Sequence, residues 1–197
     1  MITIGITGGI GSGKSTASQL LGALGAEVVD ADKVGHKIYL PDTPAWREIV
    51  AAFGAGVLAP DRTIDRTKLG PIVFSNPDAL RQLNAITHGK IYSYIQGQID
   101  YMRDKQVTRV VVVEAAILLE AGWHSLVDQI WVVVSDVEVA IARLKTYKHF
   151  TEDQARARIA AQLSNEERLA QADRVIWNNA DLAALRQAVE AAWHSLS

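Results

Sequence analysis

The residues best suited to chemistry form a glycine-rich segment near the start of the chain. Residues 8 to 16 read Gly-Gly-Ile-Gly-Ser-Gly-Lys-Ser-Thr, which fits the pattern G-x-x-x-x-G-K-[S/T]. Glycines let the backbone wrap closely around phosphate groups with its N–H groups turned inward. In this pattern Lys14 reaches the β- and γ-phosphates, and the hydroxyl of Ser15 binds Mg²⁺. The segment predicts a site for a nucleoside triphosphate with magnesium and leaves the reaction open. The residues expected to line it are Gly8, Gly9, Ile10, Gly11, Ser12, Gly13, Lys14, Ser15 and Thr16.

The elements around this loop fit an α/β fold. A β-branched run at 2–7 precedes the loop and a helical pattern at 15–24 follows it, so the loop meets the positive end of a helix. The helical stretches along the rest of the chain supply crossovers between parallel strands, which predicts three layers with a five-stranded parallel sheet in the middle. The other four strands are expected at 27–30, 109–113, 129–134 and 174–177.

Several helix starts are marked by side chains that can cap them. Ser135, Thr151 and Ser164 each stand three residues before a glutamate or glutamine, the spacing of a capping box. Thr43 and Asn76 each precede a proline that can take the first helical position. We therefore expect a helix to begin after each of these five residues.

Two stretches interrupt the alternation of strands and helices. Residues 34–105 contain helical patterns at 45–53 and from 77 to about 103, without a convincing core strand. We interpret this stretch as a helical insertion into a core made of 1–33 and 106–197, all within a single domain. Residues 145–162 are charged, helical and poor in large apolar side chains, as expected of a lid over an active site.

The composition narrows the class of protein. The 197 residues are 49% hydrophobic and 21% charged, which is typical of a soluble globular protein. The formal net charge of −2 argues against a dedicated nucleic-acid binder. Without cysteine, disulfides and thiolate metal sites are excluded. No secretory signal or apolar run of membrane-spanning length is recognisable, so we expect a cytoplasmic enzyme with no nucleic-acid or membrane partner.

Two carboxylates at the end of the second predicted strand favour a kinase. Asp30 and Asp32 lie at the carboxyl edge, where open α/β sheets bind ligands, and would project to the same side if the strand conformation continued. One carboxylate near the γ-phosphate can accept the proton of an attacking hydroxyl. The alternative is that these aspartates cap the following helix.

Two other classes of nucleotide-binding protein also carry a phosphate loop of this kind. A GTPase switch would carry the guanine-reading pattern N-K-x-D, but the nearest match, at 178–181, lacks the lysine. The D-x-x-G at 32–35 follows the second strand too closely to leave room for a switch segment. A nucleotide-binding regulator without catalysis stays open.

The order of motifs along nearly the whole chain resembles the dephospho-coenzyme A kinases. After the glycine-rich loop come Asp30-Ala31-Asp32, Ile64-Asp65-Arg66, Ile86-Thr87-His88, and an A-D-x-x-I-x-N that ends at Asn178. The resemblance implies that ATP phosphorylates the ribose 3′-hydroxyl of dephospho-CoA, the last step of coenzyme A biosynthesis. It implies Asp32 as the general base, Lys14 and Arg143 as phosphate-neutralising cations, and Asn178 near the adenine. It further implies acceptor contacts from Asp32, Arg66, Lys68, His88 and Glu120.

Each of these roles has a structural alternative. Arg143 could pair with Glu138, and His88 could be a hydrogen-bonded structural histidine. Arg66 and Lys68 could form a solvated helix face. Glu120 could cap the break at residues 121–122.

Three positions depart from the family pattern. Gly89 replaces a proline, Glu114 replaces an aspartate at the end of the third strand, and Tyr147 replaces a lid arginine. Lys145 or Lys148 could supply the missing lid charge. Another small hydroxyl acceptor therefore stays open as well.

Overall fold

Five parallel strands form the central sheet, as predicted. The computed structural model describes residues 1–196, in two compact units: Met1–Asp30 with the chain from Ile99 onward, and Ala31–Gln98. The strands belong to the first unit and lie in the order β2-β3-β1-β4-β5. Their bounds are β1 Ile2–Thr7, β2 Glu27–Asp30, β3 Val110–Glu114, β4 Gln129–Val134 and β5 Arg174–Trp177. β3 lies one residue later than expected, so Glu114 is its last residue.

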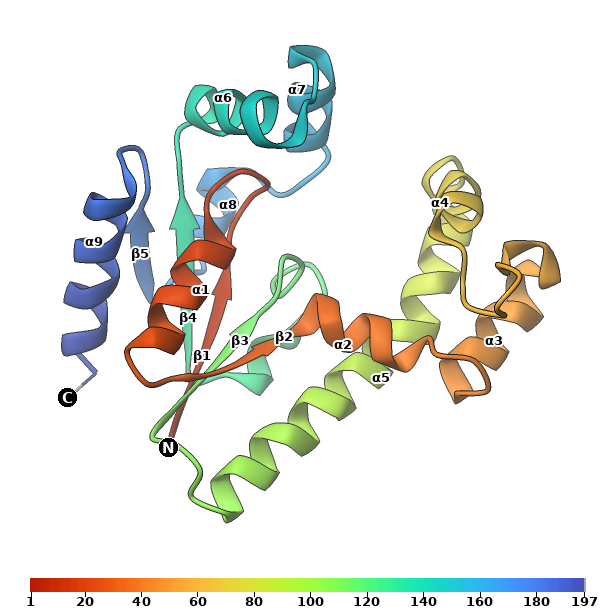
Figure 1. Cartoon of the computed structure of the whole chain (residues 1–197), viewed down its shortest axis with the longest axis horizontal. Coiled ribbons are helices and arrows are strands. Elements are labelled where there is room, and N and C mark those ends of the chain that lie inside the picture. Colours follow the sequence, from red (N-terminus) through yellow and green to blue (C-terminus); the bar gives the residue numbers. More distant parts are fainter. Residues whose placement is uncertain (197) are drawn as a thin grey trace. The chain divides into compact units, whose positions relative to one another are not determined.

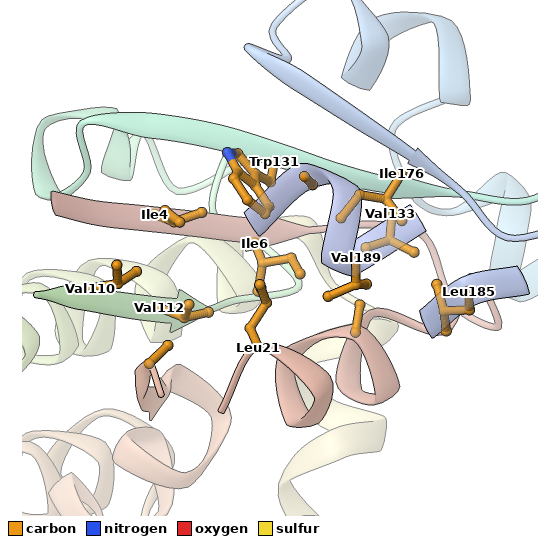
Figure 2. Packing of buried hydrophobic residues seen from close by; sticks show 13 residues of the cluster. Ile4, Ile6, Leu21, Val110, Val112, Trp131, Val133, Ile176, Leu185 and Val189 are labelled. Atoms are coloured by element: carbon orange, nitrogen blue, oxygen red, sulfur yellow. The ribbon is translucent and has the colours of Figure 1, made fainter. Parts of the chain in front are cut away.

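The main core fills one face of this sheet. α1 (Lys14–Ala23) and α9 (Leu182–His194) lie against each other on that face (Figure 1). Figure 2 shows side chains of β1, β4 and β5 meeting side chains of these two helices. Each large aliphatic side chain buried here contributes about 1.5–3 kcal/mol relative to exposure. The labelled members of the cluster are Ile4, Ile6, Leu21, Val110, Val112, Trp131, Val133, Ile176, Leu185 and Val189.

The opposite face of the sheet is covered by loop residues and two short helices, which form the third layer. The missing side chain of Gly5 leaves room for Leu118 and Val127, because a Cβ at Gly5 would lie 2.5 Å from Leu118 Cδ1. The short helix α8 (Asn165–Leu169) contacts β4, and the 3₁₀ helix Trp123–Leu126 contacts β1. The predicted α/β fold of three layers is confirmed.

Two helices lie above the phosphate loop and overlap residues 145–162, where a lid is predicted. We call these two helices the lid, and their action as a lid stays a prediction. α6 spans Val137–Lys148 and α7 spans Glu152–Ala160, and they pack through a small apolar cluster around Leu144 (Figure 1). The capping boxes of Thr151 with Gln154 and of Ser164 with Glu167 are both present.

The capping box predicted at Ser135 is wrong. The N-cap of α6 is Asp136, without a side-chain cap, and Ser135 is buried at the end of β4 with an unpartnered hydroxyl. The reason is tertiary, since Ser135 is held through its carbonyl by the side chain of Asn165, and the amide of Asp136 by Asn179.

The second unit is helical apart from a single bridge between Leu58 and Ile64. Its helices are α2 Ala31–Ile38, α3 Pro44–Phe53, the 3₁₀ turn Ala55–Val57, α4 Arg66–Phe74 and α5 Pro77–Asp104, which runs on into the first unit. Thr43 and Asn76 cap α3 and α5 as predicted. One buried cluster of this unit consists of Ile49, Val57, Leu69 and Val73.

The expectation that Asp30 and Asp32 continue one extended strand is wrong. β2 ends at Asp30 and α2 begins at Ala31, so Asp32 lies in the first turn of a helix. Residues two apart do not share a helix face. A carboxylate in the first turn is favoured by the helix dipole, which stabilises this early start.

Among residues 1–196 we find no helix with the length and apolar character needed to cross a membrane.

Candidate active site

The phosphate loop connects β1 to α1 and depends on its glycines in two ways. Gly11 and Gly13 have φ angles of 81° and 92°, a left-handed conformation that favours glycine. Gly8 is required for space, because a Cβ there would lie 2.4 Å from the carbonyl oxygen of Val133 in β4. The loop is therefore held tightly against the sheet at the start of α1.

Lys14 and Ser15 meet a single carboxylate at the carboxyl end of the sheet. Lys14 Nζ and Ser15 Oγ donate to the same oxygen, Glu114 Oε1, over 2.6 Å and 2.5 Å. The register of the sheet places Glu114 beside Ile6 and Asp30. The side chains of Lys14 and Glu114 are 11% and 9% exposed. The extra methylene of glutamate thus leaves its carboxylate within reach of both loop residues.

These oxygens suit magnesium. Mg²⁺ prefers oxygen ligands and is usually held by one or two protein groups together with substrate phosphates and water. Ser15 Oγ and Glu114 Oε1 are two such oxygens side by side. Within residues 1–196 no group of three or more His, Cys, Asp or Glu side chains could hold a metal ion on its own. The residues present fit a magnesium ion that is bound together with a nucleotide.

Asn178 supports the loop from the end of β5. Its buried Nδ2 donates to Ser12 O over 2.7 Å, and a Cβ on Gly13 would lie 2.2 Å from that same nitrogen. The sequence placed Asn178 near the adenine, and that placement stays a prediction. What the sequence did not suggest is this contact with the loop, because nothing in the local pattern joins residues so far apart.

Arg143, from α6, is bonded to the same region. Its guanidinium donates to the backbone oxygen of Asn178 over 2.9 Å, to Asn178 Oδ1 over 3.2 Å and to Ala180 O over 3.2 Å. The suggested pairing of Arg143 with Glu138 is wrong, because Glu138 pairs with Arg156. The role of Arg143 as a phosphate-neutralising cation stays a prediction.

Replacing Asn178 by alanine should loosen the loop. The change removes the bond to Ser12 O and leaves a donor of Arg143 unpaired, so we expect a loss of about 1–3 kcal/mol in the free energy of unfolding and weaker binding of ATP. Asn179→Ala is the matched control, since Asn179 bonds only the exposed amide of Asp136. Urea unfolding and ATP titration of both variants test this, and equal effects at the two positions would contradict it.

Most charged side chains of the lid are paired with one another. Lys145 lies 3.4 Å from Glu152, and Arg156 pairs with both Glu138 and Glu152. Tyr147 is 76% exposed. Lys145, one of the two suggested substitutes for the missing lid arginine, is thus occupied, and the contribution of Lys148 stays a prediction.

A cavity of about 590 Å³ lies between the loop, the lid and α8. Gly9, Ile10 and Ser12 line it from the loop, and Gln162 and Ser135 line it from the lid end and β4. The carboxamide oxygen of Gln162 accepts the backbone N–H of Ile10 over 2.8 Å. Sequence reasoning assigned Gln162 no role, because a single glutamine after a helix carries no spacing signal.

Glu120 is engaged in a buried ion pair. Its Oε1 accepts from Arg168 Nη2 over 3.1 Å, and the Arg168 side chain is fully buried. The amides at the break after it, on Ala121 and Gly122, bond to backbone carbonyls, so Glu120 is not their cap. An acceptor contact from Glu120 stays a prediction.

In the second unit, Asp32 and Arg66 both act on the phenol of Tyr39. Burial raises the pKa of Tyr39; Arg66 and a hydrogen bond with Thr87 oppose this, and the charge of Asp32 adds to it. Lys68 donates to Leu58 O over 2.7 Å, and its side chain is 49% exposed, so it lies on a solvated face and is bonded to its own unit. The unit thus brings an exposed carboxylate and a guanidinium near one buried phenol.

His88 should make the stability of the protein depend on pH. Burial lowers the pKa of His88 below its usual 6.5, since a half-buried imidazole is costly to charge. The unfolded chain then binds more protons than the folded one as the pH falls through 6.5, so the free energy of unfolding should decrease there. In His88→Gln this part of the pH dependence should be absent. Urea unfolding at pH 7.5 and 5.5 gives the change in the free energy of unfolding between the two pH values. An equal change in the parent and in the variant would refute the prediction.

The proteins to which this chain is similar match it along almost its whole length. The family model described as Dephospho-CoA kinase matches residues 2–184. The dephospho-CoA kinase of Moorella thermoacetica is 42% identical over 196 residues, covering 100% of this chain and 92% of that protein. The dephospho-CoA kinase of Geobacter metallireducens is 45% identical over 193 residues, covering 98% and 96%.

Solved structures with a similar fold include a dephospho-CoA kinase. The dephospho-CoA kinase from Campylobacter jejuni has a TM-score of 0.73 at 29% identity and covers 99% of this chain and 96% of that one. The structure of TT1252 from Thermus thermophilus has a TM-score of 0.84 at 28% identity, with coverage of 100% and 98%. Shikimate kinase from Acinetobacter baumannii, at 15% identity and a TM-score of 0.55, covers 100% and 93% and shares the fold. By sequence along its whole length and by structure, this chain belongs to the dephospho-CoA kinase family.

Proposed function

We propose that this chain transfers the γ-phosphoryl group of ATP to the ribose 3′-hydroxyl of dephospho-CoA, giving CoA and ADP. The observation that carries the proposal is membership of the dephospho-CoA kinase family over residues 2–184. The convergence of Lys14 and Ser15 on Glu114 supports it, because these are the groups that phosphoryl transfer from a nucleotide needs. We also propose that the reaction takes place in the cytoplasm.

The first unit supplies the phosphate-binding part of the reaction. The backbone amides of the loop bind the phosphates, and Lys14 exchanges its bond with Glu114 for a phosphate oxygen. Ser15 and Glu114 would hold Mg²⁺, which when bound neutralises charge on the β- and γ-phosphate oxygens. Arg143 adds positive charge from α6 and keeps the strand-end loop in place.

The second unit supplies the acceptor part. Asp32 accepts the proton of the 3′-hydroxyl as its oxygen bonds to the γ-phosphorus and the bond from that phosphorus to the β–γ bridging oxygen breaks. Asp32 is exposed, so its carboxylate is accessible to an acceptor hydroxyl. We propose acceptor contacts from Arg66, Lys68 and His88 in this unit, and separately from Glu120.

The proposal is tested by incubating the purified protein with Mg-ATP and dephospho-CoA and detecting CoA by mass spectrometry. Asp32→Asn should form CoA about 10²–10⁴-fold more slowly while still binding ATP. Asp42→Asn is the matched control, because Asp42 lies in the same unit, pairs only with the exposed Arg62, and has a positive φ that asparagine tolerates. The control should match the parent.

Two outcomes would change the assignment. ATP binding without any CoA would redirect the search to other small hydroxyl acceptors or to a regulator without catalysis. If Asp32→Asn formed CoA as fast as the parent, the proposed reaction would stand, but Asp32 would not be its general base.

A further inference from the structure

The side chain of Gln162 has a fixed orientation against the phosphate loop. Its Oε1 lies 2.8 Å from the backbone nitrogen of Ile10. A backbone N–H needs an acceptor, so the carboxamide must present its oxygen to Ile10 and point its NH₂ group elsewhere. The backbone of Gln162 is held as well, since its N–H donates to Ile159 O at the end of α7.

Ile10 is itself anchored by the lid. Its side chain packs against the apolar cluster of α6 and α7, whose buried members are Ile141, Leu144 and Ala155. Ile10 thus contacts the lid through its side chain, and it contacts Gln162 through its backbone amide. Two independent contacts therefore set the direction of the NH₂ group.

The NH₂ group of Gln162 has no hydrogen-bond partner among residues 1–196, and Gln162 lines the cavity of about 590 Å³ beside the loop. Ser12 and Ser135 line the same cavity, but their unpartnered hydroxyl oxygens are buried. The NH₂ group of Gln162, a partly exposed residue, is a donor beside the phosphate loop without a partner among the described residues. An amide donor in that position fits a ligand with acceptor oxygens.

The charged donors of the lid are largely occupied elsewhere. Lys145 pairs with Glu152, and Arg156 pairs with Glu138 and Glu152. The neutral NH₂ donor of Gln162, just after α7, takes no part in these ion pairs.

From these observations we infer that Gln162 binds the terminal phosphoryl group of ATP through its NH₂ group, while the N–H of Ile10 holds its oxygen. The inference rests on the proposed function for the identity of the nucleotide. It adds a phosphate-binding residue at the lid end, and it predicts that this residue separates ATP from ADP, which lacks the terminal group.

The test compares equilibrium affinities for Mg-ATP and Mg-ADP by titration calorimetry. Gln162→Met keeps the length of the side chain but removes both polar atoms. It should weaken ATP binding about tenfold, the value of one hydrogen bond to a charged group, and change ADP binding less than twofold. Gln162→Glu keeps an acceptor for Ile10 but has no donor and adds negative charge, so it should weaken ATP binding at least as much.

Gln154→Met is the matched control in the lid. Gln154 belongs to the capping box that starts α7, and no contact joins it to the phosphate loop in the part of the chain that the structure describes. The control should therefore perturb the lid while keeping the parent's ratio of ATP to ADP affinity.

Two results would overturn the inference. Equal weakening of ATP and ADP by Gln162→Met would mean that Gln162 only shapes the loop. ATP affinity at the parental level in Gln162→Glu would mean that its NH₂ group makes no contact with phosphate. The titrations contain no acceptor, so they do not depend on CoA formation. If the protein bound ATP but formed no CoA, the proposed function would be refuted, and the ratio of ATP to ADP affinity would still test the role of Gln162.

Discussion

Replacing Lys14 by methionine should slow CoA formation by about 10³-fold, the scale of removing one positioned charge from a phosphoryl-transfer site. The amine of Lys14 is the group that the loop pattern brings to the β- and γ-phosphates, and its bond to Glu114 places it at the end of the sheet. Methionine has a similar length, so the space that the aliphatic stem fills is largely kept.

The same change should also lower stability, for a separable reason. It leaves the carboxylate of Glu114 buried with only the hydroxyl of Ser15 as a partner, and breaking a buried ion pair typically costs about 3–5 kcal/mol. The double variant Lys14→Met/Glu114→Gln removes the stranded charge and should recover much of that stability without recovering turnover.

Single-turnover rates and urea unfolding of both variants separate these effects. A double variant that regained turnover together with stability would show that Lys14 acts only by pairing with Glu114. Turnover of the single variant within tenfold of the parent would rule out the proposed charge neutralisation.

Gly8→Ala should disable the phosphate loop, whereas Gly9→Ala should not. A methyl group at residue 8 would lie 2.4 Å from Val133 O and 2.6 Å from Ser12 Oγ. The first of these atoms belongs to the backbone of a central strand, which cannot shift without disturbing the sheet. We expect a loss of about 1–3 kcal/mol in the free energy of unfolding, the usual cost of overpacking, and loss of ATP binding because the loop is displaced.

Gly9 is the matched control one residue further along. The atom nearest to a Cβ there is Gln162 Oε1 at 3.7 Å, an ordinary contact distance, and Gly9 is not among the glycines with positive φ. Its replacement by alanine should change stability by less than about 0.5 kcal/mol. Thermal unfolding and ATP titration of the two variants provide the comparison, and similar behaviour at both positions would contradict the steric argument.

Much of the fold could be read from local pattern. The strands were recognisable because runs such as 129–134 are apolar on both faces, and only a sheet covered by helices on both sides buries such a run. The caps at Thr151 and Ser164 were recognisable because a capping box joins residues three apart, and the cap at Thr43 because a proline follows it. The exception, Ser135, failed because its surroundings come from α8 and from the loop after β5.

The start of α2 is a second feature that local pattern did not predict. The pattern Asp30-Ala31-Asp32 identified the carboxylates but not the point at which the strand ends. Alternation predicts side-chain direction only while the strand lasts, and a one-residue change from strand to helix turned Asp32 to a different face.

By itself the sequence determined the phosphate-binding chemistry, because glycine, lysine and serine at fixed spacing act through one continuous loop. The alternation of apolar strands with helices indicated the class of fold, and the order of motifs along the chain indicated the family. Only the tertiary structure decided what surrounds that loop. Glu114 reaches Lys14 across 100 positions of chain, Gln162 reaches Ile10 across 152, and Asn178 reaches Ser12 across 166. These contacts follow from the order in which the strands lie in the sheet, and strand order is settled by packing between elements, which no local spacing encodes.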